Sequence, residues 1–510
     1  MKKRHENIRQ NGESVYLTRH FPFFVDKLFS IGYNFHEIKR NFLRKFKEGL
    51  MNNFWDTSVW GGINVFAMLL LGLLAASLIK KSIKALRDSL VPTSVLAGFV
   101  LLVVSGTYMT FSGESMFNTP FMGGDGFSIL ETITYHALAL GFIASTFESS
   151  GEKGSKQRKI EIFNTGVTTV STYLVQALVG MGITILIATF VTDIFPAAGM
   201  ILPFGYGQGT GQAMNYGNIY EMDYGFVGGK SFGLAIATLG FLSASFGGVL
   251  YLSYLKKKNH LVKQDARTMK TVSNRSAKQD EIPLYESMDT LGVQLAFIFG
   301  SYVITYGIIY VLGELVPGLK SIMYGFNFLI GVLVATGVKK FIEVLEEKNI
   351  LKKHYLNDFL MVRIRNICYD IMVVAGIAAI RVSTMEGYLV VLLIIGVVGA
   401  TATFAYNYFV SRVLFKDYQD EQLVGMYGML TGTASTGIVL LRELDPEFET
   451  PVSDNMVYQN FPAIIFGLPL MLIAAQAPEN PVGTWLIALA FFVVLNIILF
   501  RKQIMGVFKK

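Results

Sequence analysis

Long apolar segments recur along the whole chain and are separated by short polar stretches. A helix needs about 20 mostly apolar residues to cross the hydrocarbon core of a bilayer. Eleven segments of this kind are present, at residues 59–79, 90–109, 133–147, 167–191, 232–255, 291–311, 321–338, 367–380, 387–410, 460–476 and 481–500. The short segments, 133–147 and 367–380, must extend into their polar flanks to span, which leaves an uncertainty of about one in the count. We therefore predict an all-α polytopic membrane protein with about eleven spans.

The charges support a membrane protein. Only 16% of the residues are charged, whereas an ordinary soluble domain carries about a quarter. The net charge of +7 is spread over short runs between apolar segments, which is not the pattern of a nucleic-acid-binding face. The single cysteine, Cys368, excludes an intrachain disulfide and a cysteine-built metal site.

The polar stretches alternate in charge and predict an orientation. The stretch 110–131 contains three acidic residues and no Lys or Arg, whereas 256–278 contains eight basic residues and one acidic residue. Other basic stretches lie at 80–87, 153–159, 339–365 and the C-terminus. The positive-inside rule places the basic stretches in the cytoplasm and 110–131 outside.

The first 58 residues do not fit this orientation. They should start outside, yet they carry eleven Lys and Arg, and the stretch 19–48 has the pattern of a basic amphipathic helix on a membrane surface. A partial insertion or a span that hydropathy misses would each resolve the conflict.

We expect five parts in the chain. They are a basic amphipathic N-terminal extension (1–58), a first transmembrane repeat (59–255), a basic cytoplasmic linker (256–288), a second transmembrane repeat (289–476), and an additional span with a basic tail (477–510).

Two glycine-rich segments interrupt the apolar pattern at matching places in the two repeats. The first lies at 203–218 and the second at 425–437, and their Gly-Thr steps, Gly209-Thr210 and Gly432-Thr433, are 223 residues apart. Five spans per repeat, with the break before the fifth, turn the second repeat upside down relative to the first. Surface turns between helices are the alternative. Because two breaks correspond and both are poor in charge, we favour paired re-entrant loops, which in transporters line the binding site.

The residues of these segments suit the binding of a small anion and a cation. Glycines let the backbone approach a ligand, exposed N–H groups bind a carboxylate, and carbonyl and hydroxyl oxygens bind a small cation. The candidate substrate- and ion-binding residues are Gly207, Gln208, Gly209, Thr210, Gly211, Gln212, Asn215, Gly428, Thr431, Gly432, Thr433, Ser435, Thr436, Arg442 and Asp370.

The chain resembles the sodium/glutamate symporter family over most of 59–476. The resemblance rests on 91–98 (Val-Pro-Thr-Ser-Val-Leu-Ala-Gly), on 207–211 (Gly-Gln-Gly-Thr-Gly), and on 428–432 (Gly-Met-Leu-Thr-Gly) with Thr436. It implies two inverted five-helix repeats, each with a glycine-rich re-entrant loop. It also implies sodium-coupled transport, an elevator-type division into a moving domain and a scaffold, and a homodimer.

The chain departs from the family pattern at several positions. Gln208 stands where a histidine is expected, Leu430 replaces a glycine, and Ser435 replaces a proline. The second loop is followed by the charged run 440–445 instead of uncharged amides. These departures are compatible with the fold and with the class of symporter. Because of them, however, the resemblance does not imply that glutamate is the substrate.

Three ionisable side chains have two interpretations each. Arg442 either holds a substrate carboxylate bidentately or pairs with Glu443 or Asp445 at the membrane edge. Asp370 either binds sodium or a proton or forms an interfacial ion pair near Arg365. For His136, which lies inside a span, we favour a hydrogen bond in helix packing over a proton relay.

The sequence contains no His-Glu-x-x-His or P-loop pattern. Gly-x-Ser-x-Gly occurs once, at 229–233, and alone it does not indicate an enzyme, because the motif acts only on the strand-to-helix turn of a hydrolase fold. A membrane transferase using Glu221 and Asp223 is a remote alternative, and a channel or a transport-derived receptor would share the fold. We expect a secondary transporter of a small carboxylate, with sodium or proton coupling and no cofactor, in the cytoplasmic membrane of a bacterium.

Overall fold

The computed structural model describes residues 53–148, 156–191, 193–258, 289–316, 320–351, 355–446 and 448–508. The chain divides into two compact units, 1–60 and 61–510. Of the first unit only residues 53–60 are described, where the first helix begins. The amphipathic helix expected at 19–48 and the linker beyond residue 258 lie outside the described residues.

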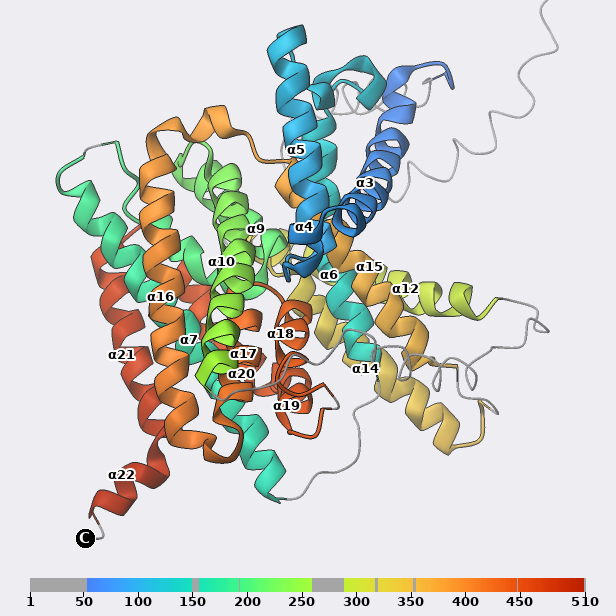
Figure 1. Ribbon diagram of the computed structural model, residues 1–510. Helices are drawn as coiled ribbons and strands as arrows, with labels where there is room; N and C mark the ends of the chain where they lie inside the picture. The colour runs from blue at the N-terminus through green and yellow to red at the C-terminus, as the bar shows by residue number, and fades with distance from the viewer. Residues whose placement is uncertain are drawn as a thin grey trace, which may run out of the picture. The chain divides into compact units, whose positions relative to one another are not determined.

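The regular elements of the described residues are all helices (Figure 1). The helices of the first half are α3 (Thr57–Ser82), α4 (Lys84–Asp88), α5 (Thr93–Ser112), α6 (Gly126–Phe147), α7 (Lys156–Ala188), α8 (Leu202–Gln208), α9 (Thr210–Tyr224) and α10 (Gly229–Lys258). Those of the second half are α12 (Thr290–Leu315), α13 (Lys320–Gly325), α14 (Asn327–Glu347), α15 (Asp358–Ala378), α16 (Leu389–Leu414), α17 (Gln419–Thr431), α18 (Ala434–Leu441), α19 (Val452–Tyr458) and α20 (Asn460–Ala475). Two further helices follow, α21 (Pro481–Leu499) and α22 (Arg501–Phe508).

Eight of the described helices are long and apolar enough to cross a membrane, or nine if α19 and α20 count as one bent span. Helices satisfy their own backbone groups, which is what a bilayer requires of a spanning segment. The chain is therefore a multi-pass membrane protein. The predicted spans 321–338, 367–380 and 460–476 correspond to α14, α15 and α20. None of these three helices is among the eight, because α14 and α15 carry several charges and α20 has only 16 residues.

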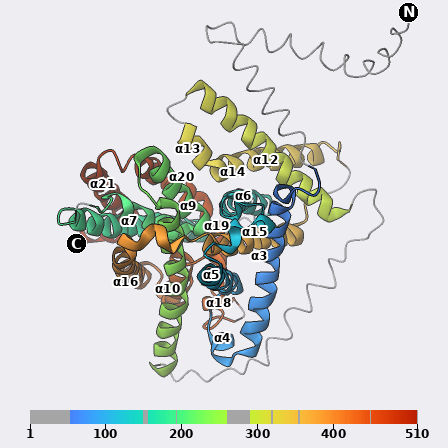
Figure 2. The ribbon, with the colours of Figure 1, turned by 90° about the horizontal axis from the view of Figure 1, so that it is seen from above.

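The helices of the second unit pack as two bundles. Helices α7, α10, α16, α20 and α21 form the first bundle together with the short helices α8, α9, α17 and α18. Helices α5, α6, α12, α14 and α15 form the second bundle, and α3 joins it where Gly72 lies against Leu101 of α5. Figures 1 and 2 show α7, α16 and α21 on one side and α12, α14 and α15 on the other.

Helices of the two halves pack against each other in reciprocal pairs, so that each contact has a counterpart in which the halves change places. Helix α5 packs on α15, and α14 packs on α6. In the first bundle, α10 packs on α16, and α20 packs on α7. The third helices of the two halves, α6 and α15, contact each other, as do the fourth, α7 and α16.

Candidate functional site

The first glycine-rich segment forms a buried hairpin of two helices. Helix α8 ends at Gln208 and α9 begins at Thr210, and Gly209 between them has φ +83° and ψ −171°. This backbone conformation is open almost only to glycine. The rings of Phe204 and Tyr216 stack across the hairpin with their centroids 3.8 Å apart. The break is therefore a fixed feature of a packed element and not a surface turn.

The second glycine-rich segment forms a similar hairpin from α17 and α18. The two helices are broken at Gly432, and Thr433 caps α18 by accepting a hydrogen bond from the Thr436 N–H at 3.2 Å. The helices cross so closely that a Cβ on Gly428 would lie 2.8 Å from the Cα of Gly437. Small residues at such crossings let helix backbones touch in a membrane protein.

The two breaks meet at the middle of α10. A Cβ on Gly209 would lie 3.9 Å from the Phe241 ring, and a Cβ on Gly432 would lie 3.1 Å from Ala244. Residues 241 and 244 are separated by less than one turn, or about 4.5 Å of rise, near the centre of the 30-residue helix. Both breaks therefore lie at about the same depth, well away from either end of α10.

Helix α7 holds both hairpins through two polar side chains. Tyr173 donates a hydrogen bond from its hydroxyl to the carbonyl of Gly207 at 3.1 Å. Gln176, three residues further, donates from Nε2 to the carbonyl of Leu430 at 2.8 Å and to Oγ1 of Thr403 at 2.9 Å. One turn of α7 thus fixes the last turn of α8 and the last turn of α17.

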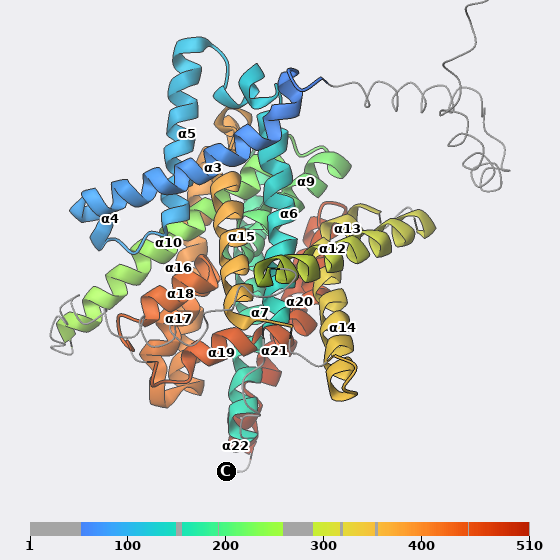
Figure 3. The ribbon, with the colours of Figure 1, turned by 90° about the vertical axis from the view of Figure 1, so that its right-hand side faces the viewer.

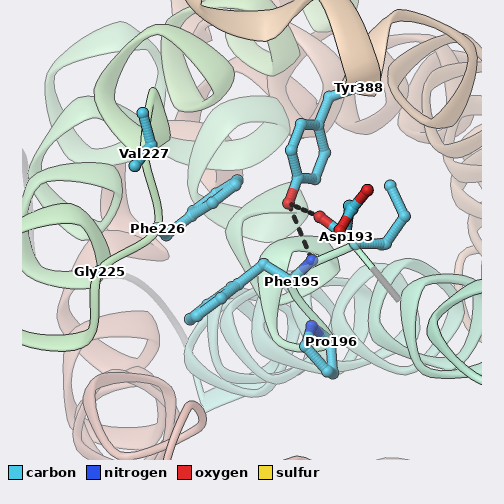
Figure 4. A pocket seen from close by; sticks show the side chains of 8 residues that line it. Asp193, Phe195, Pro196, Gly225, Phe226, Val227 and Tyr388 are labelled. Carbon is cyan, nitrogen blue, oxygen red and sulfur yellow. Dashed lines mark hydrogen bonds between the residues drawn. The ribbon is translucent and has the colours of Figure 1, made fainter. Parts of the chain in front are cut away.

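The first hairpin enters the bundle at the end where α7 stops and α16 starts. Before α16, the Tyr388 hydroxyl donates to the carbonyl of Asp193 at 3.0 Å and accepts from the N–H of Phe195 at 2.8 Å (Figure 4). Phe195 precedes α8, and its ring stacks on Phe226, which follows α9, at 4.7 Å. These residues line a pocket at the base of the hairpin, far from its break.

The second hairpin enters at the opposite end. Asp420 in the first turn of α17 accepts hydrogen bonds from Arg412 at 2.6 Å and from Tyr251 at 2.8 Å. These partners lie near the ends of α16 and α10 respectively. Figures 1 and 3 show α9 toward the upper end of the long helices and α17 and α18 toward the lower end.

Four polar residues near the breaks are almost inaccessible. Thr210 and Thr431 are 0% exposed, and Gln212 and Thr436 are 1% exposed. Gln208 and Thr433 are half-buried. Ala434, which follows Thr433, is exposed. In this structure the first break is therefore largely buried, whereas the second reaches the surface of the chain at Ala434.

The broken helices offer donors and acceptors at one place. The first N–H groups of α9 and α18 and the last carbonyls of α8 and α17 have no partners within their helices. Helix starts attract anions, and carbonyl ends attract cations. Among the described side chains, Gln212 in the first turn of α9 has a buried Nε2 without a hydrogen-bond partner. The arrangement can thus bind a carboxylate and a small cation close together.

Other predicted site residues serve packing in this conformation. The Thr210 hydroxyl donates to the carbonyl of Met372 at 3.2 Å, and Asn215 donates to the carbonyl of Gly325. The Thr431 hydroxyl donates to the carbonyl of Tyr427 at 2.6 Å. Gly211 lies against Leu138 and Met372, where a Cβ would come within 2.9 Å of each. Ser435 lies in the first turn of α18.

The two charged candidates do not lie at the breaks. Arg442 follows the far end of α18, and its exposed guanidinium lies 5.3 Å from the Phe448 ring centroid. Asp370 lies beside Ser94 of α5. It is two residues from Met372 on α15, about 200° around the helix, so it faces away from the side that contacts Thr210.

Three residues of the site were not predicted from the sequence. Tyr173, Gln176 and Phe241 contact the breaks from α7 and α10. Gln176 carried a usable signal, because an amide inside a long apolar span needs a partner. His136, in contrast, shares a hydrogen bond with the Tyr302 hydroxyl at 2.6 Å, as the packing interpretation expects.

Two broken hairpins that enter from opposite ends and meet at mid-depth define a class of protein, because secondary transporters build their binding sites in this way. The chain belongs to the sodium/glutamate symporter family, since the model of that family matches residues 61–449, more than half of the chain. This range includes both hairpins and both charged candidates, and it confirms the resemblance noted in the sequence.

The family consists of transporters and not of enzymes. A comparison with curated proteins finds no match. Among the described residues, no group of three or more His, Cys, Asp and Glu side chains is placed to hold a metal ion.

Proposed function

We propose that this protein is a secondary active transporter that carries a small carboxylate, such as glutamate or a related amino or dicarboxylic acid, together with sodium. The observation that carries the proposal is the meeting of the two helix breaks at the middle of α10. Family membership supports sodium as the coupling ion and a glutamate-like solute.

The proposed substrate site consists of the two hairpin tips. The N–H groups at the starts of α9 and α18 bind the substrate carboxylate, because helix starts carry unpaired donors and a positive partial charge. Gln208 and Thr433, the half-buried residues at the tips, are the first side chains to reach a ligand. The Gln212 amide supplies a further donor.

The proposed sodium site uses neutral oxygens. The last carbonyls of α8 and α17 and the hydroxyls of Thr433 and Thr436 are hard oxygen ligands of the kind that small cations prefer. A site without a carboxylate suits an ion that must be released in every cycle, since binding must not be too strong.

We further propose that the two halves are inverted repeats within an eleven-span topology. The reciprocal packing of α5 on α15 and α14 on α6, and of α10 on α16 and α20 on α7, supports a two-fold relation between the halves. The entry of the hairpins from opposite ends supports the inversion. A homodimer in the cytoplasmic membrane of a bacterium is part of the proposal and rests on the resemblance.

The test is uptake by the purified protein in liposomes. Radiolabelled amino and dicarboxylic acids are screened one at a time with an inward sodium gradient and, in parallel, with potassium or a proton gradient instead. We expect sodium-dependent uptake of at least one anionic acid. Binding without uptake would indicate a receptor, and uptake that never exceeds equilibrium would indicate a channel.

A further inference from the structure

A partly buried carboxylate joins the two helix bundles near the base of the first hairpin. Glu131 of α6 accepts a hydrogen bond from Nζ of Lys230 at 2.7 Å and another from Nη2 of Arg381 at 2.7 Å. Its side chain is 15% exposed, and those of Lys230 and Arg381 are 20% and 33% exposed. We call these three residues the Glu131 bridge.

The three residues come from three different elements. Glu131 lies in the second turn of α6, Lys230 lies in the first turn of α10, and Arg381 follows α15. The Arg381 N–H also donates to Oγ of Ser231 at 3.2 Å, and its guanidinium lies 4.8 Å from the Phe127 ring centroid. The Glu131 bridge therefore ties α6 of the second bundle to α10 of the first.

Elsewhere, the described contacts between the bundles are made largely by neutral groups. Helix α9 packs on α6, α13 and α15, with hydrogen bonds from Asn215 to Gly325 and from Thr210 to Met372. Other ion pairs, such as Arg412–Asp420 and Arg365–Glu148, join helices within one bundle. An ion pair differs from these contacts, because its opening leaves partly buried charges without a partner.

The buried polar residues at the tips, such as Gln212 and Thr431, must become accessible for transport. Alternating access in transporters of this class is largely a movement of one bundle against the other. Such a movement separates α10 from α6 and therefore separates Lys230 from Glu131. A partly buried carboxylate that loses its partners is left uncompensated, so the bridge opposes the movement until it opens.

We propose that Glu131 is a latch that holds the two bundles in the arrangement of this structure and opens in each transport cycle. The proposal rests on the proposed function, since only a transporter needs this movement. Glu131 is a positioning residue, because it acts through Lys230 and Arg381 and does not touch the tips.

The first test measures the latch without transport. Amide hydrogen exchange of the first turn of α10 is compared between the wild type, Glu131→Gln and the control Glu148→Gln, which removes a carboxylate of matching burial from an ion pair within the second bundle. We expect at least a tenfold faster exchange in Glu131→Gln and no change in the control. The charge swap Glu131→Lys/Lys230→Glu is expected to restore slow exchange. Unchanged exchange in Glu131→Gln would overturn the latch. If that variant fails to fold, fast exchange in a folded charge-swap protein would overturn it instead.

The second test measures the movement. Cysteines replace Glu131 and Lys230 in a Cys368→Ala background, and a short bis-methanethiosulfonate reagent tethers them. We expect the untethered variant to transport, uptake to fall at least tenfold on tethering, and reducing agent to restore it. The same tether between cysteines replacing Arg365 and Glu148, an ion pair within the second bundle, is the control, which should keep its uptake.

The outcomes separate the latch from the proposed function. Loss of uptake in the untethered Glu131 variant, or normal uptake after complete tethering, would overturn the latch. If the wild type transports nothing, the proposed function fails, while the exchange experiment still decides whether Glu131 holds the bundles together.

Discussion

Gly209 is the position where a single side chain would disturb the site most directly. Its φ of +83° and ψ of −171° are open almost only to glycine, and its Cα faces Met372 and Phe241. We expect Gly209→Val to reduce uptake at least tenfold while the protein still inserts, because the strain of about 1–3 kcal/mol falls on the tip and not on a spanning helix.

Gly307→Val is the matched control for this prediction. A Cβ at Gly307 of α12 would meet no atom within 4 Å, so the same substitution in a membrane helix should leave uptake and insertion unchanged. Normal uptake by a folded Gly209→Val protein would remove the first hairpin tip from the site.

Arg442 provides a second test at the residue scale. Helix α18 has eight residues between the Thr433 cap and Arg442, which is about 12 Å along the axis, and the guanidinium lies against Phe448. From this placement we expect Arg442→Gln and Arg442→Lys to change the KM for substrate by less than about twofold. A tenfold rise of KM in both variants would place Arg442 in the substrate site after all.

The sequence predicted the two tips because glycine leaves a local signal. The Gly-Thr steps at Gly209 and Gly432 are readable without any partner, since a membrane segment tolerates such a break only where it is buried or lines a cavity. The supporting residues Tyr173 and Gln176 could not be assigned in the same way. Their partners, Gly207 and Leu430, are fixed only by packing between segments that are distant in the sequence.

At the scale of elements, α7 determines where the second hairpin ends. Gln176 is fully buried and is hydrogen bonded to Leu430 of α17 and Thr403 of α16. We expect Gln176→Leu to raise the KM for sodium at least fivefold, because the last turn of α17 loses the donor that holds its carbonyl. Loss of such a buried hydrogen bond typically costs about 1–3 kcal/mol.

The KM for sodium is measured with substrate in excess, and the thermal stability of the same preparation is recorded. Gln157→Leu is the control, since Gln157 is exposed in the first turn of α7 and its amide donates to Glu161 of the same helix. A normal KM for sodium in a stable Gln176→Leu protein would show that the position of α17 does not depend on this hydrogen bond.

The sequence predicted most of the helices, but it did not predict which of them are long and apolar enough to count as membrane spans. Long apolar helices such as α12 and α21 were evident from composition alone. Helix α15 contains Arg363, Arg365 and Asp370, and its charges are compensated by tertiary partners such as Glu148 for Arg365. Hydropathy cannot detect such pairing, so helices of this kind are the hardest to assign from sequence.

At the scale of the whole molecule, the alternation of loop charge predicts the orientation. We expect a cysteine replacing Glu114 in a Cys368→Ala background to react with an impermeant maleimide in intact cells, because 110–131 contains no basic residue. A cysteine replacing Glu347, at the end of α14 in the basic region, should react only after the cells are opened. Both side chains are exposed, so a difference in labelling reports on which side of the membrane each residue lies. The reverse labelling pattern would overturn the orientation.

The central claim is that the two hairpin tips form one site that couples an anionic solute to sodium. The most direct measurement is uptake of radiolabelled glutamate, and of the other acids in the screen, by the purified protein in liposomes with equal solute on both sides and sodium only outside. We predict that the solute accumulates above its outside concentration, that collapsing the sodium gradient releases it, and that Gly209→Val abolishes the accumulation while Gly307→Val does not. Equilibration without accumulation under every sodium gradient would contradict the account.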